Sequence, residues 1–242
     1  MISNTYVDGD SLIFKCAYGK VKHSIMATRW NKAVSHIESN TFADNIQIAL
    51  RGDNNFRPLI YPEYKKNRPE IDPRVQEDLT WMNQYALEQG AYASDDWEAD
   101  DQVCAWAYEA DQRGEQYVIA GIDKDLLQYP GNHYNYGGSV KKPIPEDDRW
   151  VFVSPEEGLF AMFCQFITGD VSDNIIGMKG YGPVKAKKAL LGKTLKEQME
   201  VICELYKKET PDGWEDRLWV NTNLIYMRRF KEDVFSYTEY LK

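Results

Sequence analysis

The chain has 242 residues, of which 43% are hydrophobic, and it carries a formal net charge of −9 at pH 7. This composition excludes a disordered or low-complexity chain, and four scattered cysteines without a C-x-x-C pair argue against a zinc site or a disulfide framework. No basic leader precedes the first expected strand, and Gln165 interrupts the longest apolar run. We therefore expect a monomeric cytoplasmic protein that does not enter membranes.

The first part of the chain alternates between expected strands and helices. Strands are predicted at 5–8, 46–50 and 117–121, and helices at 11–19, 72–89 and 97–114. This order predicts an α/β fold in residues 1–153, with a mostly parallel central sheet flanked by helices. In such sheets, ligands bind beyond the carboxyl ends of the strands. The acidic residues that follow the strands are therefore candidates for a site.

From residue 154 onward the pattern changes to helical segments. Apolar spacing predicts helices at 155–169, 183–191, 194–208 and 214–230. We therefore expect a second, helical subdomain in residues 154–242.

Carboxylates occur in short clusters, each at the end of an apolar stretch: YVDGD, WEADD, GIDKD and GDVSD. Their side chains would repel one another unless cations neutralised them, and Mg²⁺ and Mn²⁺ prefer such oxygen ligands. Two ions held together support in-line hydrolysis of a phosphodiester. We therefore interpret the clusters as the metal site of a nuclease, with these residues: Asp8, Asp10, Glu98, Asp100, Asp101, Asp123, Asp125, Asp170 and Asp173.

Basic residues gather in three segments although the whole chain is acidic. The segments are 64–68, which includes Lys66, then 179–193 and 227–231. In the second, a turn opens a helix, so backbone N–H groups can face a phosphate at the helix N-terminus. We interpret the turn and helix as a nucleic-acid-binding element formed by Lys179, Gly180, Gly182, Lys185, Lys187 and Lys188.

The motifs VDGD, RGDNNFR, YKKNR, EADD, DKDLLQ and GDVSDNIIGMKGYG occur in an order that resembles the 5′ nuclease family, over about residues 5–192. That family includes flap endonucleases, the 5′ nuclease domain of bacterial DNA polymerase I and bacteriophage 5′–3′ exonucleases. The resemblance implies a PIN-like fold with a helix–turn–helix variant and two Mg²⁺ or Mn²⁺ ions. It also implies 5′–3′ exonuclease and flap endonuclease activity on DNA with a 5′ end, flap or nick, in replication or repair.

The resemblance also implies roles for single residues. Tyr64, Lys65 and Arg68 match the motif at the base of the family's arch, where a lysine stabilises charge on the phosphoryl group. Lys179 and Lys185 match phosphate contacts, and the loop carbonyls of this element would hold K⁺. The family's metal-binding acids match Asp8, Asp53, Glu98, Asp100, Asp101, Asp123, Asp125, Asp170 and Asp173.

Some features depart from the family pattern or leave alternatives open. Asp10 is either an outer-shell acid or the cap of the helix that begins at Ser11. The short span after Tyr64 predicts a short arch, at about 64–95. With no polymerase domain following, we expect a free-standing nuclease of phage or prophage type. The alternatives are an RNA-directed or RNase H-type nuclease of the same fold, which would accept an RNA–DNA hybrid, and an inert DNA-end-binding protein.

Overall fold

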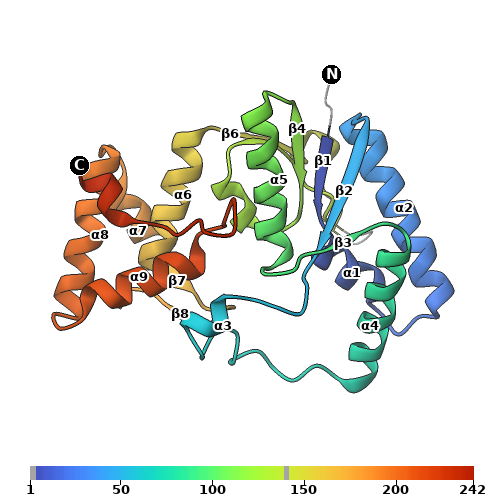
Figure 1. The fold of residues 1–242 in the computed structure, drawn as a ribbon, viewed down its shortest axis with the longest axis horizontal. Coiled ribbons are helices and arrows are strands. Elements are labelled where there is room, and N and C mark those ends of the chain that lie inside the picture. Colours follow the sequence, from blue (N-terminus) through green and yellow to red (C-terminus); the bar gives the residue numbers. More distant parts are fainter. Residues whose placement is uncertain (1–3, 139–141) are drawn as a thin grey trace. The chain divides into compact units, whose positions relative to one another are not determined.

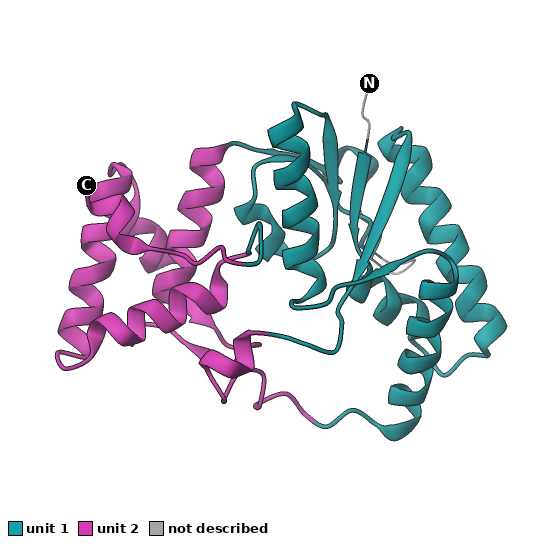
Figure 2. Ribbon diagram, viewed as in Figure 1, with its two compact units in different colours: residues 1–55, 70–154, 228–231 teal, residues 56–69, 155–227, 232–242 magenta. Residues whose placement is uncertain are grey.

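The computed structural model describes residues 4–138 and 142–242, and the chain divides into two compact units (Figure 2). Unit 1 comprises residues 1–55, 70–154 and 228–231, and unit 2 comprises residues 56–69, 155–227 and 232–242. One division falls next to the boundary expected near 153. The single boundary nevertheless differs from the structure, because residues 56–69 belong to unit 2 and residues 228–231 to unit 1.

A six-stranded sheet forms the centre of unit 1, with the strand order β3-β2-β1-β4-β5-β6. Neighbouring strands are parallel from β3 to β5, and β6 is antiparallel to β5. The expected mostly parallel α/β fold is thus confirmed. The strands are β1 (Asn4–Asp8), β2 (Asn45–Leu50), β3 (Tyr92–Ala93), β4 (Tyr117–Ala120), β5 (Gly131–Tyr134) and β6 (Trp150–Val153).

Helices cover both faces of this sheet (Figure 1). On one face, α1 (Gly9–Ala17), α2 (His23–Thr41) and α4 (Pro73–Glu88) share a core with Val7 of β1. On the other face lies α5 (Ala99–Arg113), whose Trp106 ring packs 5.8 Å from that of Tyr6. Because Tyr6 and Val7 are adjacent in a strand, they point to opposite faces. Short 3-10 helices, η1 (Lys124–Gln128) and η2 (Glu146–Asp148), complete the unit.

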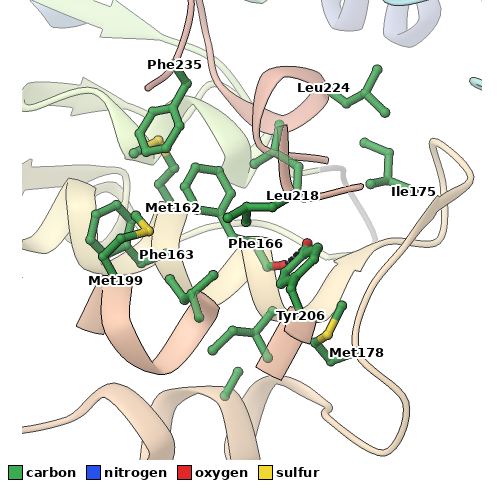
Figure 3. Packing of buried hydrophobic residues seen from close by; sticks show 14 of the residues in the cluster. Met162, Phe163, Phe166, Ile175, Met178, Met199, Tyr206, Leu218, Leu224 and Phe235 are labelled. Carbon is green, nitrogen blue, oxygen red and sulfur yellow. Dashed lines mark hydrogen bonds between the residues drawn. The ribbon is translucent and has the colours of Figure 1, made fainter. Parts of the chain in front are cut away.

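Unit 2 is mainly helical and has its own apolar core (Figure 3). Phe163 and Phe166 are fully buried, and the buried Tyr206 hydroxyl donates a hydrogen bond of 2.8 Å to the Phe166 carbonyl. The expected helical subdomain is therefore present. Its elements are α3 (Arg57–Ile60), α6 (Pro155–Thr168), β7 (Gly169–Asp170), β8 (Ile175–Ile176), α7 (Pro183–Leu190), α8 (Leu195–Glu209), α9 (Trp214–Ile225) and η3 (Tyr237–Leu241).

The last long helix ends earlier than the apolar spacing predicts. We expected it to continue to Phe230, but α9 stops at Ile225, and Tyr226 has extended backbone angles. The buried guanidinium of Arg57 binds this end, with Nε donating 2.9 Å to the Leu224 carbonyl. An outside donor thus satisfies a helix-end carbonyl.

Two glycines allow the β7–β8 hairpin to close. A Cβ atom on Gly169 would lie 2.2 Å from the Ile175 carbonyl oxygen, and one on Gly177 would lie 2.1 Å from the Thr168 carbonyl carbon. Gly169 also has a positive φ of 64°. The hairpin therefore requires glycine at both positions. In the described part of the chain, no helix is long and apolar enough to cross a membrane.

Candidate active site

The sheet topology brings several predicted acids to one edge of unit 1. β1 pairs with β2 on one side and with β4 on the other. The strand order reverses here, and ligands of open α/β sheets bind at such a switch point, beyond the carboxyl ends of the strands. Asp8 is the last residue of β1, and Asp123 follows β4 by three residues. Both residues thus lie at the carboxyl ends of neighbouring strands, as the sequence predicts.

Asp8 is deeply buried, with 1% of its surface exposed. It caps α1, because its Oδ1 accepts hydrogen bonds from the backbone N–H groups of Asp10 (3.1 Å) and Ser11 (3.5 Å). Burial raises the pKa of its carboxyl to about 6, and the negative charges of Asp10 and Asp123 add to the rise. The fold therefore places a carboxylate where its charge is unfavourable.

Asp100 in the first turn of α5 joins the same group. Burial raises its pKa well above the ordinary value, and the charges of Asp8, Asp123, Glu98 and Asp101 raise it further. These interactions show that acids from β1, from α5 and from the loop after β4 lie close enough to repel one another. We call Asp8, Glu98, Asp100 and Asp123 the carboxylate group of unit 1.

Asp101, the next residue, is fully buried, and its carboxylate accepts hydrogen bonds from two backbone N–H groups. Its Oδ2 accepts a hydrogen bond of 3.3 Å from the Glu98 N–H, as part of a capping box at the start of α5. Its Oδ1 accepts one of 3.0 Å from the N–H of Arg228. The basic segment 227–231 thus contacts α5 through Arg228, and Lys231 makes an ion pair of 2.7 Å with Asp96.

The remaining acids of unit 1 have other surroundings. Asp123 is exposed, and its Oδ1 accepts a hydrogen bond of 2.9 Å from the N–H of Asp125. Asp10 is not the cap of α1; its Oδ1 accepts from the Arg51 N–H at 3.1 Å. Asp53 is exposed and, with Asp10 and Arg51, lines a cavity of about 300 Å³ beside α4.

The other two predicted metal-binding acids, and all three predicted catalytic residues, belong to unit 2. Asp170 organises the β7–β8 turn, where its Oδ1 accepts from the N–H (2.7 Å) and the hydroxyl (2.5 Å) of Ser172. Asp173 binds Tyr64, whose hydroxyl donates to Oδ2 at 2.8 Å. Lys65 Nζ lies 3.7 Å from Oδ2, and Arg68 Nη2 lies 2.5 Å from Oδ1. The structure thus gathers Tyr64, Lys65 and Arg68 around one carboxylate.

The predicted nucleic-acid-binding element also lies within unit 2. Gly180 has a positive φ of 76°, and Gly182 is the N-cap of α7. The Lys179 N–H donates 2.7 Å to Glu209, and Lys185 Nζ donates 3.2 Å back to the Gly180 carbonyl. The lysines at 66, 179, 185, 187 and 188 are all exposed. The turn and the helix thus have the form that the sequence predicts.

The carboxylate group of unit 1 suits a hard divalent cation. Its donors are all carboxylate oxygens, and burial, together with repulsion from neighbouring acids, raises the pKa values of Asp8 and Asp100, a penalty on the charged forms that such an ion offsets. Within residues 4–138 and 142–242, no three acidic, histidine or cysteine side chains are drawn together tightly enough to hold one ion. The site thus has the ligand chemistry without a closed coordination shell.

Two residues that support the carboxylate group were missed by the sequence reasoning. The Asn55 side chain donates 3.0 Å to Glu98 Oε1, and the Tyr136 hydroxyl donates 2.6 Å to the backbone carbonyl of Asp8. Neither residue lies in an acidic motif, and the partners are 43 and 128 residues away. Only the asparagine carries a sequence signal, since it belongs to the RGDNNFR motif.

Comparison with known proteins identifies the family of this chain. Residues 4–142 match the family described as "5′-3′ exonuclease, N-terminal resolvase-like domain". DNA polymerase I of Rhizobium leguminosarum is 29% identical over 188 residues, or 72% of this chain and 18% of that protein. A 5′-3′ exonuclease of Buchnera aphidicola is 31% identical over 133 residues, or 53% of this chain and 45% of that protein. The chain thus spans less than two thirds of the length of these relatives.

Solved structures show the same fold. The T5 D15 protein, co-crystallised with metal ions, superposes with a TM-score of 0.69 at 15% identity, covering 92% of this chain and 89% of that one. The catalytic core of Rad2 in complex with a DNA substrate gives a TM-score of 0.54 at 16% identity, covering 88% of this chain and 67% of that one. At these identities, the likeness concerns the fold alone. With the family match over more than half of its length, the chain belongs to the 5′-3′ exonuclease family.

Proposed function

We propose that this protein is a metal-dependent, structure-specific 5′ nuclease that hydrolyses DNA as a 5′–3′ exonuclease and flap endonuclease, in phage or prophage replication or in repair. The observation that carries the proposal is the carboxylate group of unit 1, where Asp8 and Asp100 have raised pKa values at the carboxyl edge of a parallel sheet. Two fold neighbours support it, since the T5 D15 structure is described as a flap endonuclease with DNA and metal ions, and Rad2 is bound to a DNA substrate.

The carboxylates are the residues that would hold two Mg²⁺ or Mn²⁺ ions. Asp8, Glu98, Asp100 and Asp123 form the group around which we place them, with Asp53, Asp101, Asp125, Asp170 and Asp173 as the further candidates from the sequence. Divalent ions at such a site supply an activated water and offset negative charge on the phosphodiester oxygens. Asp101, whose two oxygens accept backbone N–H groups, also fixes the first turn of α5 and therefore orients Glu98.

Lys65 and Arg68 are the cations that would contact the scissile phosphate. Lysine and arginine stabilise the negative charge that grows on the phosphoryl oxygens, which no carboxylate can do. The Tyr64 ring lies under the ammonium group of Lys65, with Nζ 4.8 Å from the ring centroid. We assign Tyr64 to the orientation of that lysine.

The turn and helix of unit 2 would bind the duplex without reading its sequence. Backbone N–H groups at the start of α7 and the exposed lysines 179, 185, 187 and 188 can neutralise phosphates. Lys66 would add to this surface. The Gly180 carbonyl, which now accepts the Lys185 ammonium, is a candidate ligand for K⁺ in the loop.

One experiment separates this proposal from its rivals. The purified protein, which we expect to act as a monomer, is incubated with 5′-labelled flap, nicked, blunt and RNA–DNA hybrid substrates in Mg²⁺, Mn²⁺ or EDTA. We expect cleavage of the flap and nicked DNA with either metal and none in EDTA, and no activity for Asp100→Asn. Preferred cleavage of the hybrid would favour the RNA-directed alternative. Binding without cleavage in either metal would favour an inert DNA-end-binding protein.

A further inference from the structure

Two short loops of unit 2 that are about 100 residues apart in sequence are bound to one another. One is the segment 63–68, which carries the predicted catalytic residues, and the other is the β7–β8 turn at 170–174. Both loops contain a non-glycine residue with positive φ, Lys65 at 58° and Asn174 at 61°. Such backbone angles are unfavourable for lysine, although asparagine adopts them more readily, so the surrounding contacts must hold Lys65 in this conformation.

Four hydrogen bonds to backbone atoms join the loops. The Lys65 N–H donates to the Asp173 carbonyl at 3.0 Å. The side chains of Asn174 and Asn67 donate to the carbonyls of the opposite loop, Glu63 at 2.8 Å and Val171 at 2.6 Å. Arg68 Nε donates to the Ser172 carbonyl at 3.2 Å. The segment 63–68 is therefore fastened to the turn along its whole length.

The carboxylate of Asp173 is the charged centre of this contact. It accepts a hydrogen bond from Tyr64 and pairs with both Lys65 and Arg68, while only 20% of its side chain is exposed. Asp170, three residues earlier, is bound differently: the donors to its Oδ1 are Ser172 and the Asp173 N–H, all within its own turn. Two acids of one motif thus have different partners.

We propose that Asp173 is a positioning residue, which holds Lys65 and Arg68 in place before a metal ion or DNA is bound. The carboxylate replaces the phosphate as the partner of both cations in the free protein, so their side chains are ordered in advance. The donors to Asp170 Oδ1, in contrast, lie within its own turn, so this residue is not expected to hold the two cations. This inference rests on the proposed function for the role of Lys65, but its central test does not require nuclease activity.

Limited digestion with trypsin in EDTA tests the positioning role in the metal-free protein. Trypsin can cut after Lys65 and Lys66 only when this loop opens. Loss of the charged contacts in Asp173→Asn should speed cleavage at both sites by about tenfold. The matched variant Asp170→Asn should cut at the wild-type rate. Cleavage after Lys193, in the turn between α7 and α8, reports opening elsewhere in unit 2 and should not change.

Two outcomes would overturn the proposal: equal cleavage after Lys65 in the two variants, or an unchanged rate in Asp173→Asn. If cleavage after Lys193 also accelerates, Arg68→Ala decides instead, because it removes one partner and leaves the carboxylate in place. Arg68→Ala should then speed cleavage after Lys65, and a wild-type rate there would reject the positioning role. Because these rates are measured in EDTA, a protein without nuclease activity could still show the effect.

A second readout separates positioning from metal binding. If Asp173 acts through Lys65, then adding Asp173→Asn to Lys65→Ala should change single-turnover cleavage of a flap by less than about threefold, since residues that act as one unit are not additive. A further loss of a hundredfold in the double variant would make Asp173 an independent metal ligand and would reject the positioning role.

Discussion

The acidic side chains of the two units have opposite kinds of neighbours. In unit 1, Asp8 and Asp100 lie beside other acids, and their pKa values are raised by burial and then by mutual repulsion. In unit 2, Asp173 is equally an acid of a predicted metal motif, but Lys65 and Arg68 pair with it directly. In the first arrangement neighbouring acids repel one another, and in the second a carboxylate pairs with two cations.

This difference determines how strongly each unit would be stabilised by a bound divalent ion. A group of carboxylates that repel one another gains free energy from a bound divalent ion, because the ion removes the repulsion. A paired carboxylate gains less, because an ion must compete with cations that are already present. We infer that the proposed metal requirement would originate mainly in unit 1, and that unit 2 would supply ordered cations and the proposed contacts to the duplex.

The largest effect should come from removing a charge in unit 1. Asp100→Asn should lower single-turnover cleavage of a 5′ flap by several orders of magnitude, because the group loses an ion ligand. The metal-free protein should be at least as stable as the wild type, because the substitution relieves repulsion. Rapid-quench kinetics and thermal unfolding in EDTA measure the two effects. A marked fall in melting temperature would show that the carboxylate stabilises the fold. It would contradict the inference that the acids of unit 1 repel one another.

A cation of unit 2 should affect the rate and not the binding. Lys65→Ala should slow single-turnover cleavage by about 10²–10³-fold, because a preorganised charge at the phosphoryl group is lost. Lys66→Ala is the matched control, since its ammonium pairs at 2.8 Å with the exposed Glu63 and not with Asp173. DNA affinity is measured in Ca²⁺, with turnover blocked. A slower enzyme in Lys66→Ala would place the motif one residue out of register.

Local pattern was sufficient for the parts of the fold in which neighbouring residues decide the structure. Alternation of strands and helices predicted the sheet, and the position of Asp8 and Asp123 after apolar strands predicted the carboxylate edge. The end of α9 was predicted wrongly, because a distant residue, Arg57, binds the Leu224 carbonyl at that end. Helical spacing in the sequence carries no information about such a partner.

Within the candidate site, residue type was predictable and the partner was not. The motif containing Asp173 indicated a metal ligand, whereas the contacts show two cations from a segment 105 to 108 residues earlier. Asp101 likewise reads as one more acid of the cluster, but it binds backbone N–H groups of Glu98 and Arg228. Electrostatic roles depend on which charges the fold brings together, and one sequence does not specify these pairs.

The pH dependence of stability sharpens the comparison. The pKa of Asp8 rises from 3.8 to about 6 in the folded protein, so its charge destabilises the fold above pH 6 and has no such effect below about pH 4. The metal-free wild type should therefore lose stability relative to Asp8→Asn as the pH rises from 4 to 7. A rise of about two pKa units corresponds to roughly 3 kcal/mol.

Denaturant unfolding of both proteins in EDTA measures this difference. Asparagine can still accept the N–H groups that cap α1, so the variant removes the charge and keeps the cap. Added Mg²⁺ at pH 7 should restore the stability of the wild type and leave the variant less affected. A difference between the two proteins that does not vary with pH would show that the charge of Asp8 is already compensated, as that of Asp173 is.

The smallest effect concerns the surface of unit 2. Each lysine that neutralises a phosphate contributes roughly −0.9 to the slope of log K against log salt, so Lys179→Ala with Lys185→Ala should flatten this slope by up to about two units. Cleavage at low salt and saturating enzyme should change little, because neither lysine belongs to the carboxylate group of unit 1 or to the contact around Asp173. Fluorescence anisotropy with a nicked duplex in Ca²⁺, at several salt concentrations, gives the slope.

Lys187→Ala is the control for an indirect effect of Lys185, which also donates to the Gly180 carbonyl and so supports the turn. Lys187 is on the same helix without that bond, so its variant reports the phosphate contact alone. An unchanged slope in both the double variant and Lys187→Ala would show that α7 is not part of the DNA interface. Another surface would then bind the duplex.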